Sequence, residues 1–185
     1  MSGPVRAFIA VFPPLEVRKE ALAAARRSPL GDRVRWIRPE NVHLTLQFLG
    51  DVREEALDSI CAAVGEVCAG YAPFDVGLMG LGAFPSARRA RILWAGTGMG
   101  CDRLSSLAAN VDAALVPLGF EREKRPYTPH MTLGRVRGRP ASLDLPSDAE
   151  GPEFQVERVE LMKSTLTQEG PIYESLKAFV LGERG

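Results

Sequence analysis

Residues 42–48, VHLTLQF, and residues 129–135, PHMTLGR, carry the same four-residue pattern, His-x-Thr-Leu. The chain has only two histidines among its 185 residues, and each of them, His43 and His130, begins one copy of the pattern. Apolar and polar residues alternate in both copies, which is typical of a strand with one buried face. The pattern therefore predicts two matching strands that each carry one histidine.

Alternation also assigns the side chains to faces. His43 and Thr45 share the polar face of the first strand, and His130 and Thr132 share that of the second, because residues two apart point the same way. Leu44, Leu46 and Phe48 are expected together on the apolar face. If the two strands meet, two imidazoles and two hydroxyls converge on one point.

The surrounding sequence repeats an order of elements. RAFIAVF (6–12) and ARILWAG (90–96) predict buried strands, and a helical stretch lies between each of them and the histidine strand that follows. Phe8 precedes His43 by 35 residues, and Ile92 precedes His130 by 38. We interpret this order as a duplicated α+β unit whose halves face each other about a pseudo-two-fold axis, with the histidine strands in the middle.

Further elements follow from periodicity. A helix is predicted from about residue 54, and a second one ends at Gly119. Their apolar stripes comprise Leu57, Ile60, Cys61, Val64, Val67 and Cys68 in the first, and Leu104, Leu107, Ala108, Val111, Leu115 and Leu118 in the second. Residues 154–166 and 172–181 predict two more strands, joined by the turn-like TQEGP.

Composition excludes several classes of protein. Lys plus Arg and Asp plus Glu balance at 23 each, so bulk charge gives no argument for non-specific nucleic-acid binding. The three cysteines form no CxxC pair and have no metal-ligand spacing with the histidines. No segment resembles a signal peptide or a membrane span. We expect a single domain over residues 1–185 that is soluble in the reducing cytoplasm, with no membrane partner and no bound metal.

Two histidines suit acid–base chemistry. Imidazole, with an ordinary pKa of about 6.5, can accept or give a proton near neutral pH. One neutral ring can take a proton from an attacking water while one protonated ring gives a proton to a departing oxygen. Each such group raises the reaction rate by about 100- to 10,000-fold. Hydroxyls beside them can donate to phosphoryl oxygens. The pattern predicts a phosphodiester site that needs no metal.

Basic residues cluster around the second copy of the pattern, between Arg122 and Arg139. Arg135 is the best placed to hold phosphate, although a solvated strand edge is an alternative for the arginines after His130. Phe12, Phe84 and Tyr127 are candidates for stacking on a base of RNA, with a place in the core as the alternative.

Four blocks of the chain, RAFIAVFPP, RWIRPENVHLTLQFLGDV, LGAFPSARRARILWAG and PYTPHMTLGRVR, resemble the two-histidine phosphoesterase superfamily. Within it, the chain is similar to the RNA 2′,3′-cyclic phosphodiesterases, also described as 2′-5′ RNA ligases. The resemblance runs nearly end to end. It implies a bilobal α+β fold of two mainly antiparallel sheets with flanking helices around a central cleft.

The resemblance also implies an activity: hydrolysis of a terminal 2′,3′-cyclic phosphate of RNA to a 2′-phosphomonoester, without metal or cofactor. His43 and His130 would be catalytic, with His130 as the base and His43 as the acid. Thr45, Thr132 and Arg135 would bind phosphate. A 2′-5′ RNA ligation would use the same site.

Two alternatives stay open. One is a phosphodiesterase of the same superfamily that acts on a small cyclic nucleotide or on an ADP-ribose cyclic phosphate. The other is a non-catalytic module that binds RNA ends. The expected partner is RNA with a 2′,3′-cyclic phosphate end, tRNA fragments included, and nothing in the strand edges requires more than a monomer.

Overall fold

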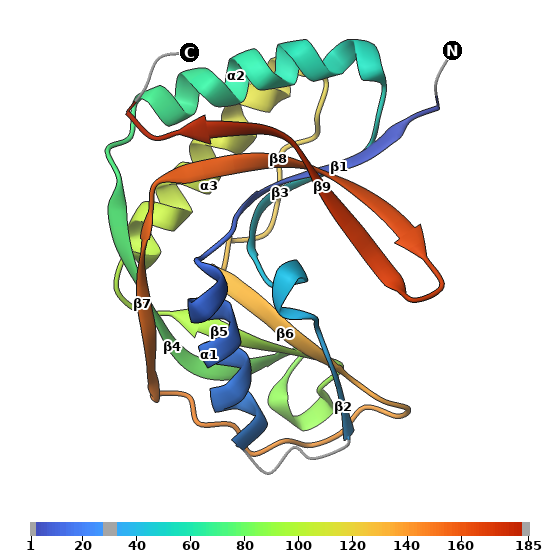
Figure 1. Ribbon diagram of the computed structural model, residues 1–185, viewed down its shortest axis with the longest axis vertical. Helices are drawn as coiled ribbons and strands as arrows, with labels where there is room; N and C mark the ends of the chain where they lie inside the picture. The colour runs from blue at the N-terminus through green and yellow to red at the C-terminus, as the bar shows by residue number, and fades with distance from the viewer. Residues whose placement is uncertain (1–2, 28–32, 183–185) are drawn as a thin grey trace.

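The structure is a computed structural model that describes residues 3–27 and 33–182 (Figure 1). Its strands are β1 Val5–Val11, β2 Val34–Trp36, β3 Leu44–Val52, β4 Phe74–Phe84, β5 Ile92–Thr97, β6 His130–Val136, β7 Glu150–Val156, β8 Arg158–Thr167 and β9 Gly170–Val180. Its helices are α1 Leu15–Arg27, α2 Leu57–Ala69 and α3 Cys101–Leu115. Short 3-10 turns are η2 Pro39–Asn41, η3 Glu54–Ala56, η4 Ala87–Arg89 and η5 Val116–Leu118.

The strands of the described residues form one nine-stranded antiparallel sheet in the order β7-β4-β5-β6-β3-β1-β8-β9, with β2 added beside β6. The α+β class with antiparallel strands is confirmed. The expected division into two sheets is wrong, because the two histidine strands pair with each other. They do so through one residue pair, Leu44 with Met131, so the sheet is narrowest at its middle.

This narrow junction separates a half with β7, β4, β5 and β6 from a half with β3, β1, β8 and β9. α1 follows β1 of the second half but packs against β7 and β6 of the first, whereas α3 follows β5 and packs against β3 and α2. In Figure 1, α2 lies beside β8 and β9 with α3 packed against α2, and α1 lies beside β6. The predicted order of strand, helix and histidine strand thus occurs twice, while the symmetry that relates the halves stays a prediction.

The helix stripes lie largely where periodicity places them. Ile60, Val64 and Cys68 of α2 are buried, and so are Leu104, Leu107, Ala108, Val111 and Leu115 of α3. Cys61 is only half-buried. Leu118 lies beyond α3 in η5 and is 40% exposed, because the helix ends before the stripe would continue.

Two local expectations differ from the structure. The C-terminal region forms three strands and not two, because the chain turns at Glu157, pairing β7 with β4 and β8 with β1. Phe48 is 74% exposed and not on the buried face with Leu44 and Leu46. A register shift opposite Ile9 and Ala10 inserts an extra residue into β3, and each extra residue reverses the alternation.

Candidate active site

The junction of the two halves brings the predicted polar residues together. Leu44 and Met131 are direct partners in antiparallel strands. Antiparallel register then places His43 across from Thr132 and Thr45 across from His130. All four side chains are partly buried, while their strand neighbours Leu44 and Met131 are fully buried on the opposite face.

Both histidine rings are held by the same contact. Nδ1 of His43 lies 2.7 Å from the carbonyl oxygen of Asn41, and Nδ1 of His130 lies 2.7 Å from that of Thr128. A carbonyl oxygen can only accept, so Nδ1 carries the hydrogen in each ring. Nε2 of a neutral ring is then left with a lone pair. Each histidine is therefore oriented by the backbone carbonyl two residues before it to exchange a proton through Nε2.

Aromatic rings enclose His43. The ring centroids of Phe8, Phe12 and Tyr173 lie 5.0, 5.1 and 5.3 Å from that of His43. Phe8 is buried and forms a small apolar cluster with Ala10 and Met162, which Phe12 and Tyr173 border. On this face of the sheet, His43 therefore packs against apolar and aromatic side chains.

His130 has its own aromatic neighbours. Phe84 of β4 lies edge-on to it at 4.9 Å between centroids, and Trp94 of β5 lies at 5.9 Å. Two of the three aromatic candidates, Phe12 and Phe84, thus lie one against each histidine.

Burial controls the pKa of both rings. The pKa of His43 is lowered from 6.5 to about 4, mainly by burial; the bond to Asn41 opposes the lowering, and the charges of His130 and Arg18 add to it. Burial also lowers the pKa of His130, opposed by its bond to Thr128. Because each positive ring disfavours the other, the pair takes up one proton more readily than two. An anion between them would favour that proton.

Tyr127 has a different environment from Phe12 and Phe84. Its hydroxyl donates to the backbone carbonyl oxygen of Thr45 at 2.8 Å, and its ring packs against the main core. Burial raises the pKa of this hydroxyl above its ordinary range. These contacts tie β3 to the segment before β6. They favour the alternative for Tyr127, a place in the core, over contact with a base.

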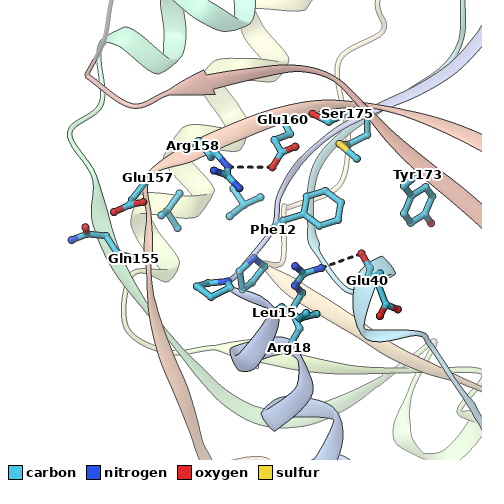
Figure 2. A pocket seen from close by; sticks show the side chains of 15 residues that line it. Phe12, Leu15, Arg18, Glu40, Gln155, Glu157, Arg158, Glu160, Tyr173 and Ser175 are labelled. Carbon is cyan, nitrogen blue, oxygen red and sulfur yellow. Dashed lines mark hydrogen bonds and ion pairs between the residues drawn. The ribbon is translucent and has the colours of Figure 1, made fainter.

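A cavity of about 610 Å³ lies between β1, α1 and the strands β8 and β9, and Figure 2 shows the side chains that line it, Phe12 and Tyr173 among them. Phe12 and Tyr173, which both contact His43, form part of its wall. Arg18 borders it and donates through Nη1 to the carbonyl oxygens of Pro39 and Glu40, at 3.1 and 3.0 Å. Across the cavity, Nε of Arg158 lies 3.3 Å from the Glu160 carboxylate. The cavity is large enough for a nucleoside.

A second hollow, of about 350 Å³, lies on the other side of Tyr173 and contains Arg135. Arg135 is an exposed residue of β6. Burial raises the pKa of the Tyr173 hydroxyl, and the positive charge of Arg135 opposes this increase. Arg135, the residue predicted to bind phosphate, therefore lies at the edge of the site, on the side of His43.

The sequence matches a known family. The family profile described as LigT like Phosphoesterase matches residues 11–94 and 99–173, which include both histidine strands. The chain belongs to the LigT-like phosphoesterase family. Both copies of the His-x-Thr-Leu pattern thus fall within the matched part of this LigT-like chain.

Relatives and solved structures agree with this assignment. The LigT-like chain is 33% identical to an RNA 2′,3′-cyclic phosphodiesterase of Aquifex aeolicus, over 96% of this chain and 98% of that protein. It is 38% identical to one of Methanothermobacter thermautotrophicus, over 80% and 83%. Its fold matches TT0787 of Thermus thermophilus with a TM-score of 0.84 at 31% identity, covering 97% and 100%. It matches E. coli LigT complexed with 3′-AMP with a TM-score of 0.82 at 26% identity, covering 97% and 99%.

Around the two histidines of this LigT-like chain lie residues that the sequence did not indicate. Sequence reasoning missed Phe8, Trp94, Tyr173 and Arg18. The repeat contained a signal for two of them, since Phe8 and Trp94 both belong to the strand that precedes and pairs with a histidine strand. Tyr173 and Arg18 reach the site only through tertiary folding.

Among residues 3–27 and 33–182, no three His, Cys, Asp or Glu side chains gather in a way that could hold a metal ion. Within the same residues, each helix falls short of the length and apolar character that crossing a membrane requires.

Proposed function

We propose that this chain hydrolyses the 2′,3′-cyclic phosphate at the end of an RNA to a 2′-phosphomonoester, by acid–base catalysis with His43 and His130 and without a metal ion. The observation that carries the proposal is the matched pair of Nδ1 contacts, which leaves both Nε2 atoms for proton exchange beside two threonines. The names of its relatives, RNA 2′,3′-cyclic phosphodiesterases, support the substrate.

In the proposed reaction, a water oxygen attacks phosphorus in line with the departing 3′ oxygen. Neutral Nε2 of His130 takes a proton from the water. Protonated Nε2 of His43 gives its proton to the 3′ oxygen as the phosphorus–O3′ bond breaks. The product keeps its phosphate on the 2′ oxygen and regains a 3′ hydroxyl.

The environments of the rings support this division of roles. His43 is enclosed by three aromatic rings, and a desolvated imidazolium with a lowered pKa is a strong proton donor. In the ligand-free protein its pKa of about 4 keeps it uncharged at neutral pH. The anionic cyclic phosphate would supply the missing stabilisation, since an opposite charge nearby raises the pKa of a histidine.

The remaining predicted residues have roles in binding. The hydroxyls of Thr45 and Thr132 would donate to the non-bridging phosphoryl oxygens, where charge accumulates in the transition state. Arg135 would approach the phosphate from the edge of the site. Phe12 and Phe84 would offer ring surfaces on which a base can stack.

The same site would allow ligation. If a 5′ hydroxyl of a second RNA replaces water, the same loss of its proton and the same departure of the 3′ oxygen form a 2′-5′ linkage. Ligation would therefore need no further catalytic group.

The direct test is to incubate a short oligoribonucleotide that ends in 2′,3′-cyclic phosphate with the protein in excess EDTA, and to resolve 2′- from 3′-phosphate products. Formation of the 2′-phosphate alone is expected. Activity that is seen only with a divalent ion would refute the metal-free mechanism. Binding of the RNA end without turnover would support the alternative of a non-catalytic module.

A further inference from the structure

Two arginines face each other across neighbouring strands close to the site. Arg35 of β2 is the direct partner of Arg135 of β6 in the antiparallel register. Directly opposed residues have Cβ atoms about 5 Å apart, and like charges in such positions are destabilising. Both side chains are exposed. An anion bound between the two guanidinium groups would offset this repulsion and accept hydrogen bonds from both.

A third arginine borders the same hollow. Arg38, Arg35 and Arg135 all line the cavity of about 350 Å³ on the far side of Tyr173, and we refer to it as the arginine groove. Among the residues that line it, the acidic side chain is Glu169, whose carboxylate lies 3.8 Å from Nη2 of Arg38. Nη2 of Arg35 lies 3.4 Å from the backbone oxygen of Glu169 and not against its carboxylate. Three arginines against one glutamate leave the groove cationic.

The groove leads to His43. Asn41 lines it, and the backbone oxygen of Asn41 is the acceptor for Nδ1 of His43. The Asn41 side chain donates to the carbonyl oxygen of Pro171 at 2.8 Å, which fastens the β8–β9 hairpin over the segment that contains η2. Figure 1 shows this hairpin projecting beyond the rest of the sheet, on the same side as η2. The groove therefore lies next to His43, separated from it by Asn41, within reach of an RNA chain whose terminal phosphate is held at the histidines.

The cavity on the other side of Tyr173 has the opposite character. Glu40, Glu157 and Glu160 line it together with two arginines, Arg18 and Arg158. Both arginines have protein acceptors: Arg18 donates to backbone oxygens, and Arg158 lies against Glu160. An anionic RNA backbone would be repelled there and attracted by the arginine groove.

We propose that the arginine groove binds the phosphodiester on the 5′ side of the terminal nucleoside, so that the enzyme prefers the end of an RNA chain to a free cyclic mononucleotide. This inference rests on the proposed function, and it names the substrate class of the same site. A cyclic mononucleotide has no such phosphodiester, so it would fill the histidine site and leave the groove empty.

The test compares two substrates and three proteins. The substrates are cytidine 2′,3′-cyclic phosphate and an oligoribonucleotide of several residues that ends in cytidine 2′,3′-cyclic phosphate. The proteins are the wild type, the double variant Arg35→Ala/Arg38→Ala, and Arg53→Ala as a control for loss of an exposed arginine beyond the far end of β3. Arg135 is left in place because it borders both the groove and the proposed site of the cyclic phosphate, so its loss would affect both substrates.

We expect the wild type to favour the oligoribonucleotide, and the double variant to lose about tenfold or more in kcat/KM on it, through KM, with little change on the mononucleotide. The salt dependence of KM for the oligoribonucleotide should also become shallower, because fewer counterions are released from the RNA. Arg53→Ala should behave as the wild type.

Other outcomes would overturn the inference in distinguishable ways. An equal loss on both substrates, or no loss on the oligoribonucleotide, refutes the groove while leaving the proposed function intact. Absence of turnover of either substrate by the wild type refutes the proposed function, and the inference with it.

Discussion

Leu44 of β3 and Met131 of β6 form the one residue pair that joins the two histidine strands within the described residues. Both side chains are fully buried on the face away from the site. The pair fixes the register of the two His-x-Thr segments with apolar contacts, so that their polar faces present the two rings and two hydroxyls together. The position of the catalytic candidates is thus determined from the back of the sheet.

Replacing either histidine should remove most of the turnover. His43→Ala and His130→Ala are each expected to lower kcat by about 100- to 10,000-fold, since each removes one proton-transfer group. Circular dichroism and a thermal melt check that the fold is intact. Because His43 is enclosed by aromatic rings, His43→Gln is the second variant, which fills more of the space without a titratable group.

The roles of the two rings can be separated with a substrate whose bridging 3′ oxygen is replaced by sulfur. A thiolate leaves without a proton, so this substrate should restore turnover to the variant that lacks the acid and not to the one that lacks the base. We expect rescue of His43→Gln and none of His130→Ala. Rescue of the His130 variant would reverse the assignment.

The threonine hydroxyls should act on the transition state. Thr45→Val and Thr132→Val keep the shape of the side chain and remove one donor, so kcat is expected to fall on the order of 100-fold while KM changes less. Thr→Ser at the same positions keeps the donor and should retain most of the activity. Equal losses in the valine and serine variants would argue for a packing role.

The histidine pattern predicted the junction well because a strand's two faces follow from local alternation, and because both copies follow the same order of strand and helix. The number of sheets could not be predicted in this way, since it depends on whether Leu44 meets Met131 across 87 residues of chain. Phe48 was misplaced because the shift opposite Ile9 and Ala10 is a property of the paired strands and leaves no mark in one of them.

The environment of the site was predicted less completely than its central residues. Phe12 and Phe84 lie against the histidines, but Tyr173 comes from the far hairpin, and no local pattern connects it with His43. Tyr127, the third aromatic candidate, packs against the main core, which was the alternative for it, and its hydroxyl donates to the carbonyl oxygen of Thr45.

The Tyr127 contact predicts a stability effect. Tyr127→Phe leaves the partly buried Thr45 carbonyl oxygen without this donor, at a cost of about 1–3 kcal/mol in the free energy of unfolding, while kcat per folded molecule should change little. Urea denaturation measures the first and the cyclic-phosphate assay the second. Tyr71→Phe is a matched control, since its bonds to Ser106 and Asn110 are exposed and water can replace them. A greater loss in the control would contradict the interpretation.

The activity should depend on pH as a bell. Catalysis needs one ring protonated and the other neutral, and kcat/KM reports the pKa values of the pair in the free enzyme. Burial lowers both, so the maximum of kcat/KM should lie below 6.5, with the acid limb near pH 4. Because the substrate anion raises the pKa of both rings, the maximum of kcat should lie at higher pH. A kcat/KM profile that is flat from about pH 5 to 9 would contradict the mechanism if chemistry limits the rate.

The lowered pKa of His43 also predicts how stability depends on pH. The unfolded chain binds a proton at His43 below about 6.5, and the folded protein binds it only below about 4. The folded state therefore has its full stability above about pH 6.5. As the pH falls from there to about 4, the free energy of unfolding decreases by about 3 kcal/mol through this one group. Urea denaturation of the wild type and of His43→Gln at several pH values between about 4 and 7.5 measures the difference. The variant should lose less stability on acidification, because it has no ring to protonate; equal losses in both proteins would show that His43 is not held neutral by burial.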